Sequence, residues 1–327
     1  MVSTKTQILA LLSDGAFCSG TDLGRRLGIS RSAVHKHISG LSAKGLPIRR
    51  VPGRGYQLTG GIQLLDRGRI QTLVGAAETR VVVEVVEEIS STNSYLIREP
   101  PLPGQARVCV TEHQHAGRGR RGRPWVASPY RNLMLSLAWS FATWPAAVTT
   151  LGLCAAVAAA HAVERVTPAP ISLKWPNDLM WELRKLGGLL IELEGEAGGV
   201  CTAVVGLGLN VEILDADADE IDQPWIDLRT VAGAPVDRNL LAAACIEELI
   251  AMLKDFPDSG FARARAEWEA RDGLVGQAVR AVTESGALVG DVRGVDEHGR
   301  LLVADSGGTL HRLVSGDVSV RTVHATG

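Results

Sequence analysis

The sequence predicts an α+β protein in three parts, because the residue pattern changes twice along its 327 residues. Residues 1–62 carry helical patterns followed by a basic stretch, and they end at Gly60-Gly61, which marks a boundary. Residues 63–272 alternate apolar runs typical of strands with longer helical stretches, as in a sheet covered by helices. Residues 273–327 contain short valine-rich runs separated by Gly, Asp and Ser, as in a small β-barrel.

The composition is that of an ordinary globular protein. Hydrophobic residues make up 46% of the chain and charged residues 21%, and the formal net charge is −2. Nucleic-acid binding would therefore need a locally basic patch. The five cysteines have no paired spacing, which favours free thiols in a reducing compartment. The polar start of the chain and the short, alanine-rich run Leu151–Val163 predict neither a secretory signal nor a membrane span, so we expect a cytoplasmic protein.

The first part has the pattern of a DNA-binding helix pair. Apolar residues within Lys5–Leu12 predict one short helix, and Thr21–Ile38 predicts two more joined by a turn at Gly28. We expect Thr21 to cap the second helix and Ser30 to cap the third. The residues expected to form the shared core are Leu23, Leu27, Ile29, Val34, Ile38 and Leu41.

The exposed face of the third helix would present hydrogen-bond donors to a DNA major groove. The residues on that face are Arg31, Ser32, His35 and Lys36. The next segment, Ile48–Leu58, predicts a hairpin with a basic tip at Arg54, which completes the pattern of a winged helix-turn-helix. The alternative is a small helical interaction domain with solvated charges, and the basic hairpin favours DNA binding over it.

The middle part predicts one sheet with helices on one face. The expected strands are Val81–Glu87, Arg107–Glu112, Asn132–Ser140, Ile171–Trp175, Gly188–Leu193 and Cys201–Leu209. The expected helices are Thr92–Arg98, Thr149–Val166, Asn239–Phe256 and Phe261–Arg271.

The densest chemical feature is residues 117–123, which we call the arginine–glycine loop. Its glycines, which let backbone N–H groups approach anionic oxygens, are Gly117, Gly119 and Gly122. Its arginines, which add charge-assisted contacts to phosphate, are Arg118, Arg120, Arg121 and Arg123. It is not a Walker P-loop, because Arg123-Pro124 stands where Lys and Ser/Thr are required. Residue types alone leave three interpretations: a nucleotide-phosphate loop, a second nucleic-acid patch, or a solvated basic loop.

Two further segments favour phosphate handling. Lys174–Asp178 ends a predicted strand and presents Asn177 and Asp178 at its exit. Lys185 precedes Gly187-Gly188 and an apolar run, where a lysine suits a carboxylate or an α-phosphate. The alternative for this lysine is an ordinary hairpin turn that leaves it solvated.

Together, these segments resemble biotin–protein ligases, specifically the bacterial class that also acts as the biotin operon repressor. The matching motifs are Ser91-Thr92-Asn93, Gln114–Gly122 with Trp125, Lys174–Asp178, Lys185–Gly188 and Gly206–Asn210. Any one motif is weak, but the ordered set spans nearly the whole middle part. The resemblance implies a class II synthetase-like core between a winged helix-turn-helix and an SH3-like C-terminal barrel.

The resemblance also implies an activity and partners. Such ligases use ATP and Mg²⁺ to activate biotin as biotinyl-5′-AMP, and then transfer biotin to a lysine of a biotin carboxyl carrier protein. It further implies operator DNA as a partner and a homodimer promoted by the ligand. The sequence contains no dedicated all-protein metal site, so we expect Mg²⁺ to arrive on the phosphates.

Individual residues receive roles from the same resemblance. Those expected at biotin are Ser91, Thr92, Asn93, Gln114, Gly117, Arg118, Lys185 and Gly188. Those expected at the adenylate are Arg118, Gly119, Arg120, Arg121, Gly122, Arg123, Trp125, Asn177 and Asn210. The expected catalytic residues are Lys185, Arg118 and Asp178, with Lys185 as the main electrostatic group.

Two other functions compete with this one. A transcription regulator could use the middle part only to sense a small ligand, but sensing does not need phosphate-handling groups. A lipoate ligase-like acyltransferase has a similar core, but the DNA-binding part and the match around Gln114–Trp125 disfavour it.

Overall fold

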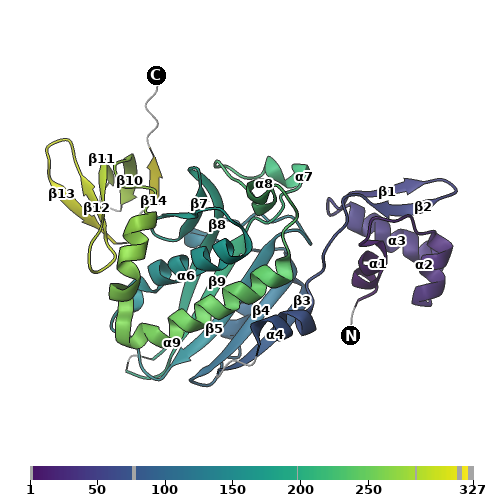
Figure 1. Cartoon of the computed structure of the whole chain (residues 1–327), viewed down its shortest axis with the longest axis horizontal. Coiled ribbons are helices and arrows are strands. Elements are labelled where there is room, and N and C mark those ends of the chain that lie inside the picture. Colours follow the sequence, from purple (N-terminus) through teal and green to yellow (C-terminus); the bar gives the residue numbers. More distant parts are fainter. Residues whose placement is uncertain (1–2, 76–78, 197, 284–285, 315–318, 323–327) are drawn as a thin grey trace.

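The computed structural model describes residues 3–75, 79–196, 198–283, 286–314 and 319–322. A small helical head lies at one end of a larger core, and a small C-terminal sheet lies at the other end (Figure 1). Within those described ranges, no helix is both long and apolar enough to cross a bilayer.

The head has the arrangement of a winged helix-turn-helix. It consists of α1 (Thr4–Leu12), α2 (Gly20–Leu27), α3 (Arg31–Ser42) and the antiparallel hairpin of β1 (Ile48–Val51) and β2 (Gly55–Leu58). Ser30 caps α3 as predicted, by accepting a hydrogen bond from the Ala33 N–H. The predicted cap of α2 is wrong: the helix begins one residue before Thr21, and Ser19 Oγ accepts from the Asp22 N–H at 3.0 Å.

The predicted core of the head is confirmed. Leu23, Val34, Ile38 and Leu41 are buried together, and Leu27 and Ile29 pack against them. Gly28 ends α2 with a φ of 67°, a left-handed conformation that glycine adopts without strain.

The core is built on a seven-stranded mixed sheet with the strand order β3-β4-β5-β9-β8-β7-β6. Its strands are β3 (Arg80–Ile89), β4 (Gln105–Gln114), β5 (Leu133–Phe141), β6 (Ser172–Lys174), β7 (Asp178–Trp181), β8 (Arg184–Gly195) and β9 (Cys201–Leu209). β3 and β4 are parallel, and every other neighbouring pair is antiparallel. All six predicted strands are present, and β7 is additional.

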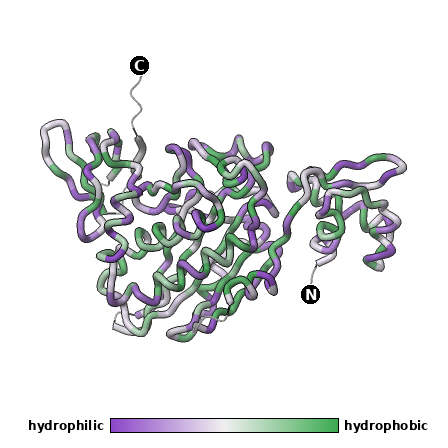
Figure 2. Tube along the Cα trace, in the orientation of Figure 1, coloured by the Kyte–Doolittle hydropathy of each residue, from purple (hydrophilic) through white to green (hydrophobic). Residues whose placement is uncertain are grey.

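Helices cover the two faces of this sheet unequally. The long helices α6 (Leu151–Val166) and α9 (Arg238–Arg271) and the shorter α4 (Arg67–Val74) pack on one face (Figure 1). Figure 2 shows apolar colouring along the strands and along the helices that cover them. The prediction of helices on one face is wrong for α5 (Thr92–Ile97), because Leu96 packs on Cys109, Ala138 and Val204 in a separate buried cluster.

The two helices predicted at the end of the core form one element, α9, which kinks at Gly260 (φ 53°). Short helical segments occupy the loops: η1 (Arg120–Gly122), η2 (Val148–Thr150), α7 (Asp215–Ala218) and α8 (Leu228–Ala232).

The C-terminal part is a five-stranded sheet with the order β13-β12-β11-β10-β14. Its strands are β10 (Ala278–Thr283), β11 (Gly286–Val295), β12 (Leu301–Ala304), β13 (Leu310–Leu313) and β14 (Ser319–Thr322). The sheet is open over the described residues, so the predicted SH3-like barrel is not confirmed. Residues 315–318, between β13 and β14, lie outside the described residues.

Polar contacts attach the head to the edge strand β3. Thr6 Oγ1 donates to Glu87 Oε2 at 2.7 Å, and Lys44 Nζ donates to Glu88 Oε2 at 2.6 Å. Tyr130, which follows the arginine–glycine loop along the chain, is buried within the hydrophobic cluster of the head. The head and the core therefore share both polar and apolar contacts.

Candidate functional site

A cavity of about 670 Å³ opens in the core beside the first turn of α5. Its lining includes the start of α5, the arginine–glycine loop, the ends of β6 to β8, the last residues of β9, and residues 220–225. Every residue predicted at biotin or the adenylate lines this cavity except Gly117 and Gly122. Motifs far apart in the sequence are thus brought to one place.

Two glycines of β9 leave room for the side chains above them. A Cβ at Gly208 would lie 2.6 Å from the Trp125 ring, and a Cβ at Gly206 would overlap the Asn93 amide. Since strand residues alternate between faces, Gly206 and Gly208 lie on the same face of the sheet. Glycine at both positions therefore lets Asn93 and Trp125 pack directly on β9.

A network of short polar side chains forms one end of the cavity. Gln114 Oε1 accepts hydrogen bonds from Thr92 N at 2.7 Å and from Thr92 Oγ1 at 3.0 Å. Ser136 Oγ donates to Asn93 Oδ1 at 2.5 Å and lies 2.6 Å from Thr92 Oγ1. Ser91 caps α5 through the Ser94 N–H. These groups suit a small polar ligand ring.

The arginine–glycine loop is folded on itself. Gly119 N donates to Arg123 O at 2.7 Å, and Trp125 N donates to Gly117 O at 2.9 Å. Arg121 and Gly122 have positive φ values of 59° and 70°, which turn the chain sharply. Trp125 Nε1 is buried and has no hydrogen-bond partner among the described residues. A buried, unpaired donor beside a cavity indicates a place for a polar ligand atom.

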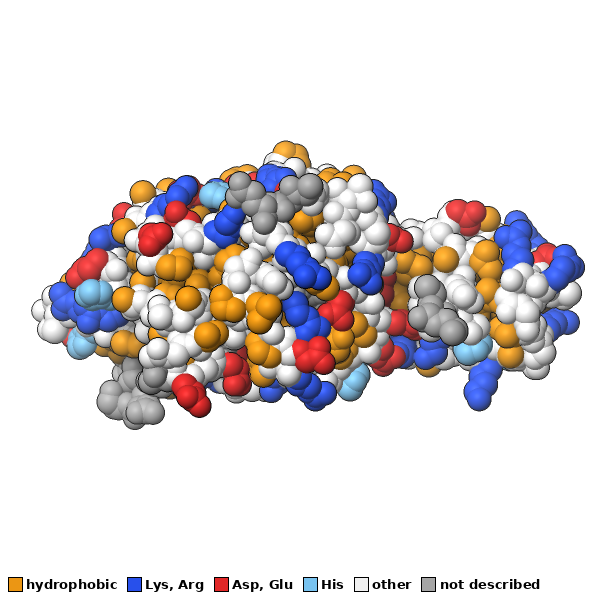
Figure 3. Space-filling model, turned by 90° about the horizontal axis from the view of Figure 1, so that it is seen from below, with side chains coloured by type: hydrophobic (Ala, Val, Ile, Leu, Met, Phe, Trp, Pro, Cys, Tyr) orange, Lys and Arg blue, Asp and Glu red, His pale blue; other side chains and the backbone are white. Residues whose placement is uncertain are grey.

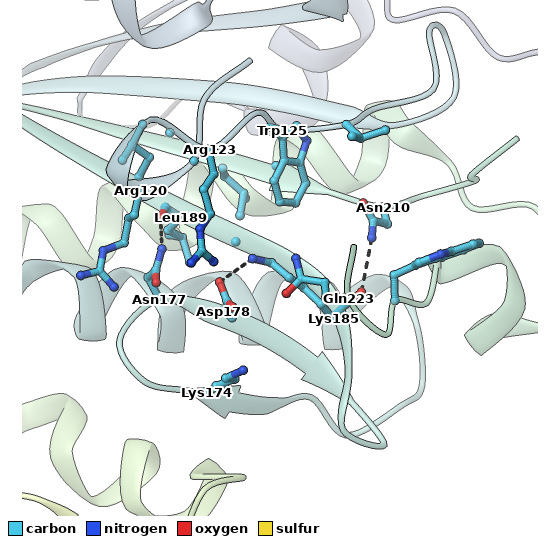
Figure 4. A pocket seen from close by; sticks show the side chains of 18 of the residues that line it. Arg120, Arg123, Trp125, Lys174, Asn177, Asp178, Lys185, Leu189, Asn210 and Gln223 are labelled. Atoms are coloured by element: carbon cyan, nitrogen blue, oxygen red, sulfur yellow. Dashed lines mark hydrogen bonds and ion pairs between the residues drawn. The ribbon is translucent and has the colours of Figure 1, made fainter. Parts of the chain in front are cut away.

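The arginines of this loop point in different directions. Arg118 is at the rim, where Nη2 donates to Ser94 Oγ at 2.8 Å and lies 3.4 Å from Glu192 Oε1. Arg120 and Arg123 point from the loop toward Asn177 and Asp178 (Figure 4). Burial lowers the pKa of Arg120, and the nearby carboxylate of Asp178 opposes that shift.

Lys185 and Asp178 meet across two neighbouring strands. Lys185 Nζ lies 2.8 Å from Asp178 Oδ1, and it is 5.5 Å from the centre of the Trp125 ring (Figure 4). The strand β7, absent from the sequence prediction, places Asp178 opposite Gly188 of β8. A Cβ at Gly188 would lie 3.4 Å from Lys185 Nζ, so glycine keeps this space clear. The lysine and the arginine–glycine loop face one cavity.

Backbone contacts fix the position of Lys185. Its N–H donates to Pro224 O at 2.9 Å, and its carbonyl accepts from Ile226 N at 3.0 Å. Asn210 Nδ2 donates to Lys185 O at 3.3 Å, so this side chain holds the backbone of the lysine. Asn177 Nδ2 likewise donates to the backbone, to Leu189 O.

Sequence reasoning missed several lining residues. Gln223 and Trp225 belong to an irregular segment without a recognisable motif, and they reach the cavity because residue 185 pairs with this segment. The signal that could have identified this segment is Trp225, an aromatic residue that directly follows Pro224 in a polar loop. Lys174 also lines the cavity.

The residues predicted to contact DNA lie together on the head. Arg31, Ser32, His35 and Lys36 are exposed on α3. Figure 3 shows Lys and Arg side chains gathered over the head, at the right of the view. The guanidinium of Arg54, at the tip of the wing, lies 4.0 Å from the centre of the Phe17 ring.

The fold and the site define a class of protein: an enzyme core with a cationic cavity for an anionic ligand, joined to a winged helix-turn-helix. Family models agree with each part. Residues 4–57 match an HTH domain, residues 85–210 match the biotin/lipoate A/B protein ligase family, and residues 274–321 match the biotin protein ligase C terminal domain.

Individual relatives cover nearly the whole chain. The chain is 38% identical over 315 residues to the bifunctional ligase/repressor BirA of Salmonella typhimurium, covering 96% of this chain and 97% of the relative. It is 31% identical to the biotin--[acetyl-CoA-carboxylase] ligase of Mycobacterium tuberculosis, over 77% of this chain and 94% of the relative. The chain therefore belongs to the bifunctional ligase/repressor family of biotin protein ligases.

A solved structure supports the same conclusion. The biotin protein ligase from Aquifex aeolicus in complex with biotin and ATP has a TM-score of 0.63 and 27% identity to this chain. The match covers 74% of this chain and 99% of that one.

Proposed function

We propose that this protein is an ATP-dependent biotin–protein ligase that also acts as a biotin-responsive repressor. The observation that carries the ligase function is one cavity with Lys185 and Asp178 on one side and the arginine–glycine loop on the other. Such an arrangement can hold a carboxylate and a phosphate close together while it neutralises their charges.

In the first step, an oxygen of the biotin carboxylate attacks the α-phosphorus of ATP. A carboxylate–phosphorus bond forms, the bond from the α-phosphorus to the leaving oxygen breaks, and pyrophosphate departs. Lys185 Nζ lies where it can contact both the carboxylate and the α-phosphate, and this pairing reduces the repulsion between two anions. Arg120 and Arg123 lie on the opposite wall, where we assign them to the phosphates.

The polar end of the cavity suits the ureido ring of biotin, which has two N–H donors and one carbonyl acceptor. We assign this ring to the group formed by Ser91, Thr92 and Gln114. Gly188 keeps the backbone close to the ligand, Gly117 leaves room for the Gln114 side chain, and Trp125 covers the ligand. Asn93 supports this group without binding the ligand, since both the oxygen and the nitrogen of its side-chain amide bond to the protein.

In the second step, a lysine amine of the carrier protein attacks the acyl carbon of biotinyl-5′-AMP. A C–N bond forms, the bond from carbon to the phosphate oxygen breaks, AMP leaves, and the amine loses a proton. We propose a biotin carboxyl carrier protein as the acceptor, and Asp178 as the carboxylate that keeps Lys185 oriented during both steps.

Mg²⁺ has no cage of protein ligands among the residues that the structure describes. Over the described residues, no group of three or more His, Cys, Asp or Glu side chains is placed to hold a metal ion. We propose that Mg²⁺ enters with the phosphates of ATP.

We propose that the head binds operator DNA through Arg31, Ser32, His35, Lys36 and Arg54. The proposed domains are residues 1–62, 63–272 and 273–327, with the last as a small SH3-like barrel. A register shift between Val292 and Gly294, where strands bend, supports such curvature. Ligand-promoted homodimerisation on a two-fold DNA site completes the proposal.

The ligase function is tested by biotin-dependent exchange of labelled pyrophosphate into ATP. We expect exchange with biotin and none with lipoate, which separates this function from a lipoate ligase. A folded protein that binds biotin without exchange would instead be a simple sensor. Operator gel shifts and sedimentation with biotin and ATP test the repressor and dimer proposals separately.

A further inference from the structure

Glu192 lies just beyond the cavity, on β8. It shares a face of this strand with Gly188 and Leu190, which both line the cavity. Its carboxylate does not belong to the cavity lining, and no motif in the sequence analysis includes it.

The two oxygens of Glu192 contact two different segments. Oε2 accepts a hydrogen bond from Asn93 Nδ2 at 2.8 Å, and Oε1 lies 3.4 Å from Arg118 Nη2. One carboxylate therefore connects β8 to the first turn of α5 and to the base of the arginine–glycine loop.

The contact with Asn93 is buried, and other hydrogen bonds fix the orientation of the Asn93 amide. Asn93 is 4% exposed, its Nδ2 also donates to Leu190 O at 3.2 Å, and its Oδ1 accepts from Ser136. Without Glu192, one N–H of this buried amide loses its acceptor, which is costly. Rotation of the amide to recover a partner would disturb Ser136 and then Thr92, at the polar end of the cavity.

The contact with Arg118 affects position more than stability. The Arg118 side chain is 46% exposed, and exposed ion pairs add little to the free energy of unfolding. The backbone bonds of the loop connect its own residues, whereas Arg118 connects it to Ser94 and Glu192. This pair thus helps to fix the loop against α5.

We propose that Glu192 is a positioning residue for the biotin half of the site, because its carboxylate holds Asn93 and Arg118 in one arrangement. The inference rests on the proposed ligase function. It goes further by assigning the affinity for biotin partly to a residue that does not touch the ligand.

The test uses the full chain carrying Glu192→Ala or Glu192→Gln, with Glu194→Gln as the matched control. Glu194 lies two residues further along the same face of β8 and is exposed. Pyrophosphate exchange is measured with biotin varied at saturating ATP, and with ATP varied at saturating biotin. Thermal unfolding is recorded for each variant.

We expect Glu192→Ala to raise the KM for biotin about 10-fold, the order of a lost charged hydrogen bond, while kcat and the KM for ATP stay within about twofold. Glu192→Gln keeps an acceptor for Asn93 and should show a smaller rise. Glu192→Ala and Asn93→Ala together should raise the KM for biotin by less than the product of the single effects, because they remove one interaction.

An unchanged KM for biotin in Glu192→Ala would overturn the inference. A lower kcat together with higher KM values for both biotin and ATP and a lowered melting temperature would also overturn it. Absence of exchange in the unmodified protein would instead contradict the proposed ligase function. The two failures are therefore distinguishable.

Discussion

Lys185 Nζ and Asp178 Oδ1 lie 2.8 Å apart, on neighbouring strands that meet at the floor of one cavity. Both side chains are mostly buried, with 16% and 17% of their surface exposed. An ion pair in such a place directs the lysine, because Asp178 restricts where the ammonium can lie. The lysine remains close to the Trp125 ring, and hence to the arginine–glycine loop.

Replacing Lys185 should remove much of the adenylation activity. Lys185→Gln takes away the positive charge at the proposed meeting point of carboxylate and α-phosphate, so we expect pyrophosphate exchange to fall about 10²–10³-fold. Arg184→Gln is the control, since Arg184 directly precedes Lys185 on β8 and contacts Glu182 and Trp181 outside the cavity. Equal exchange rates in the two variants would refute the role of Lys185.

Adding one methyl group at Gly208 should displace Trp125. The new Cβ would lie 2.6 Å from the ring, so the ring must move and the cavity loses its cover. We expect Gly208→Ala to lower the free energy of unfolding by about 1–3 kcal/mol, as overpacking does. Exchange activity should fall with it.

Gly152→Ala, in the first turn of α6, is the control for Gly208→Ala. A Cβ there would meet Ile191 Cγ1 at 3.7 Å, an ordinary contact, and alanine favours helix. Its melting temperature and activity should stay the same or rise slightly. A Gly208→Ala protein with full activity and unchanged stability would show that Trp125 is not constrained by this strand.

Operator binding should depend on Lys36 through its charge. Lys36→Gln on the exposed face of α3 should weaken binding and reduce the slope of log affinity against log salt by about 1. Exchange activity should not change, because Lys36 lies on the head. Lys254→Gln, an exposed lysine on α9, should leave both measurements unaltered, and an unchanged salt slope in Lys36→Gln would argue against α3 as the recognition helix.

The sequence predicted the elements that carry their own pattern. β9 was predicted with its observed bounds, Cys201–Leu209, because a long apolar run bounded by polar residues identifies a buried strand. β7 was missed because it has only 4 residues, and its pairing with β8 rather than its composition makes it a strand. The cap of α2 was misplaced by two residues, since Ser19 and Thr21 are both suitable caps and only the tertiary fold selects between them.

The sequence identified which residues belong to the site, but not where their side chains point or what they contact. Arg118 and Arg120 are equivalent by residue type, yet Arg118 contacts Ser94 at the rim, whereas Arg120 points toward Asn177 (Figure 4). Asn93 and Asn210 were expected at the ligand, whereas their amides bond to the protein, a distinction that requires atomic positions. Glu192 carries no motif and is found only through its partners.

Acid should loosen the contact between the head and the core. Lys44 donates a hydrogen bond to Glu88, and this bond holds the pKa of the Glu88 carboxyl below its usual value of 4.5. The stabilisation from this contact is therefore complete above about pH 4.5, and it is lost as the pH falls through the lowered pKa. His113 Nδ1 lies 3.4 Å from the same carboxylate, and burial first, then Lys44, lowers the pKa of His113 below 6.5. Neutral His113 is thus favoured in the folded state, and stability also falls as the pH drops below about 6.5.

Small-angle scattering of the full chain between pH 8 and pH 3.5 measures this loosening as an increase in the radius of gyration, with the effect of His113 expected below about pH 6.5 and that of Glu88 below about pH 4.5. Glu88→Gln should show an expanded shape already at pH 8, because a neutral amide holds Lys44 more weakly, and the remaining pH dependence would come from His113. Glu99→Gln is the control, since Glu99 is exposed and pairs with Arg107 away from the head. Glu88 is partly exposed, so the change in docking free energy should be below about 1 kcal/mol. Identical scattering of Glu88→Gln and the unmodified protein at every pH would mean that Tyr130 and the linker hold the head without this carboxylate.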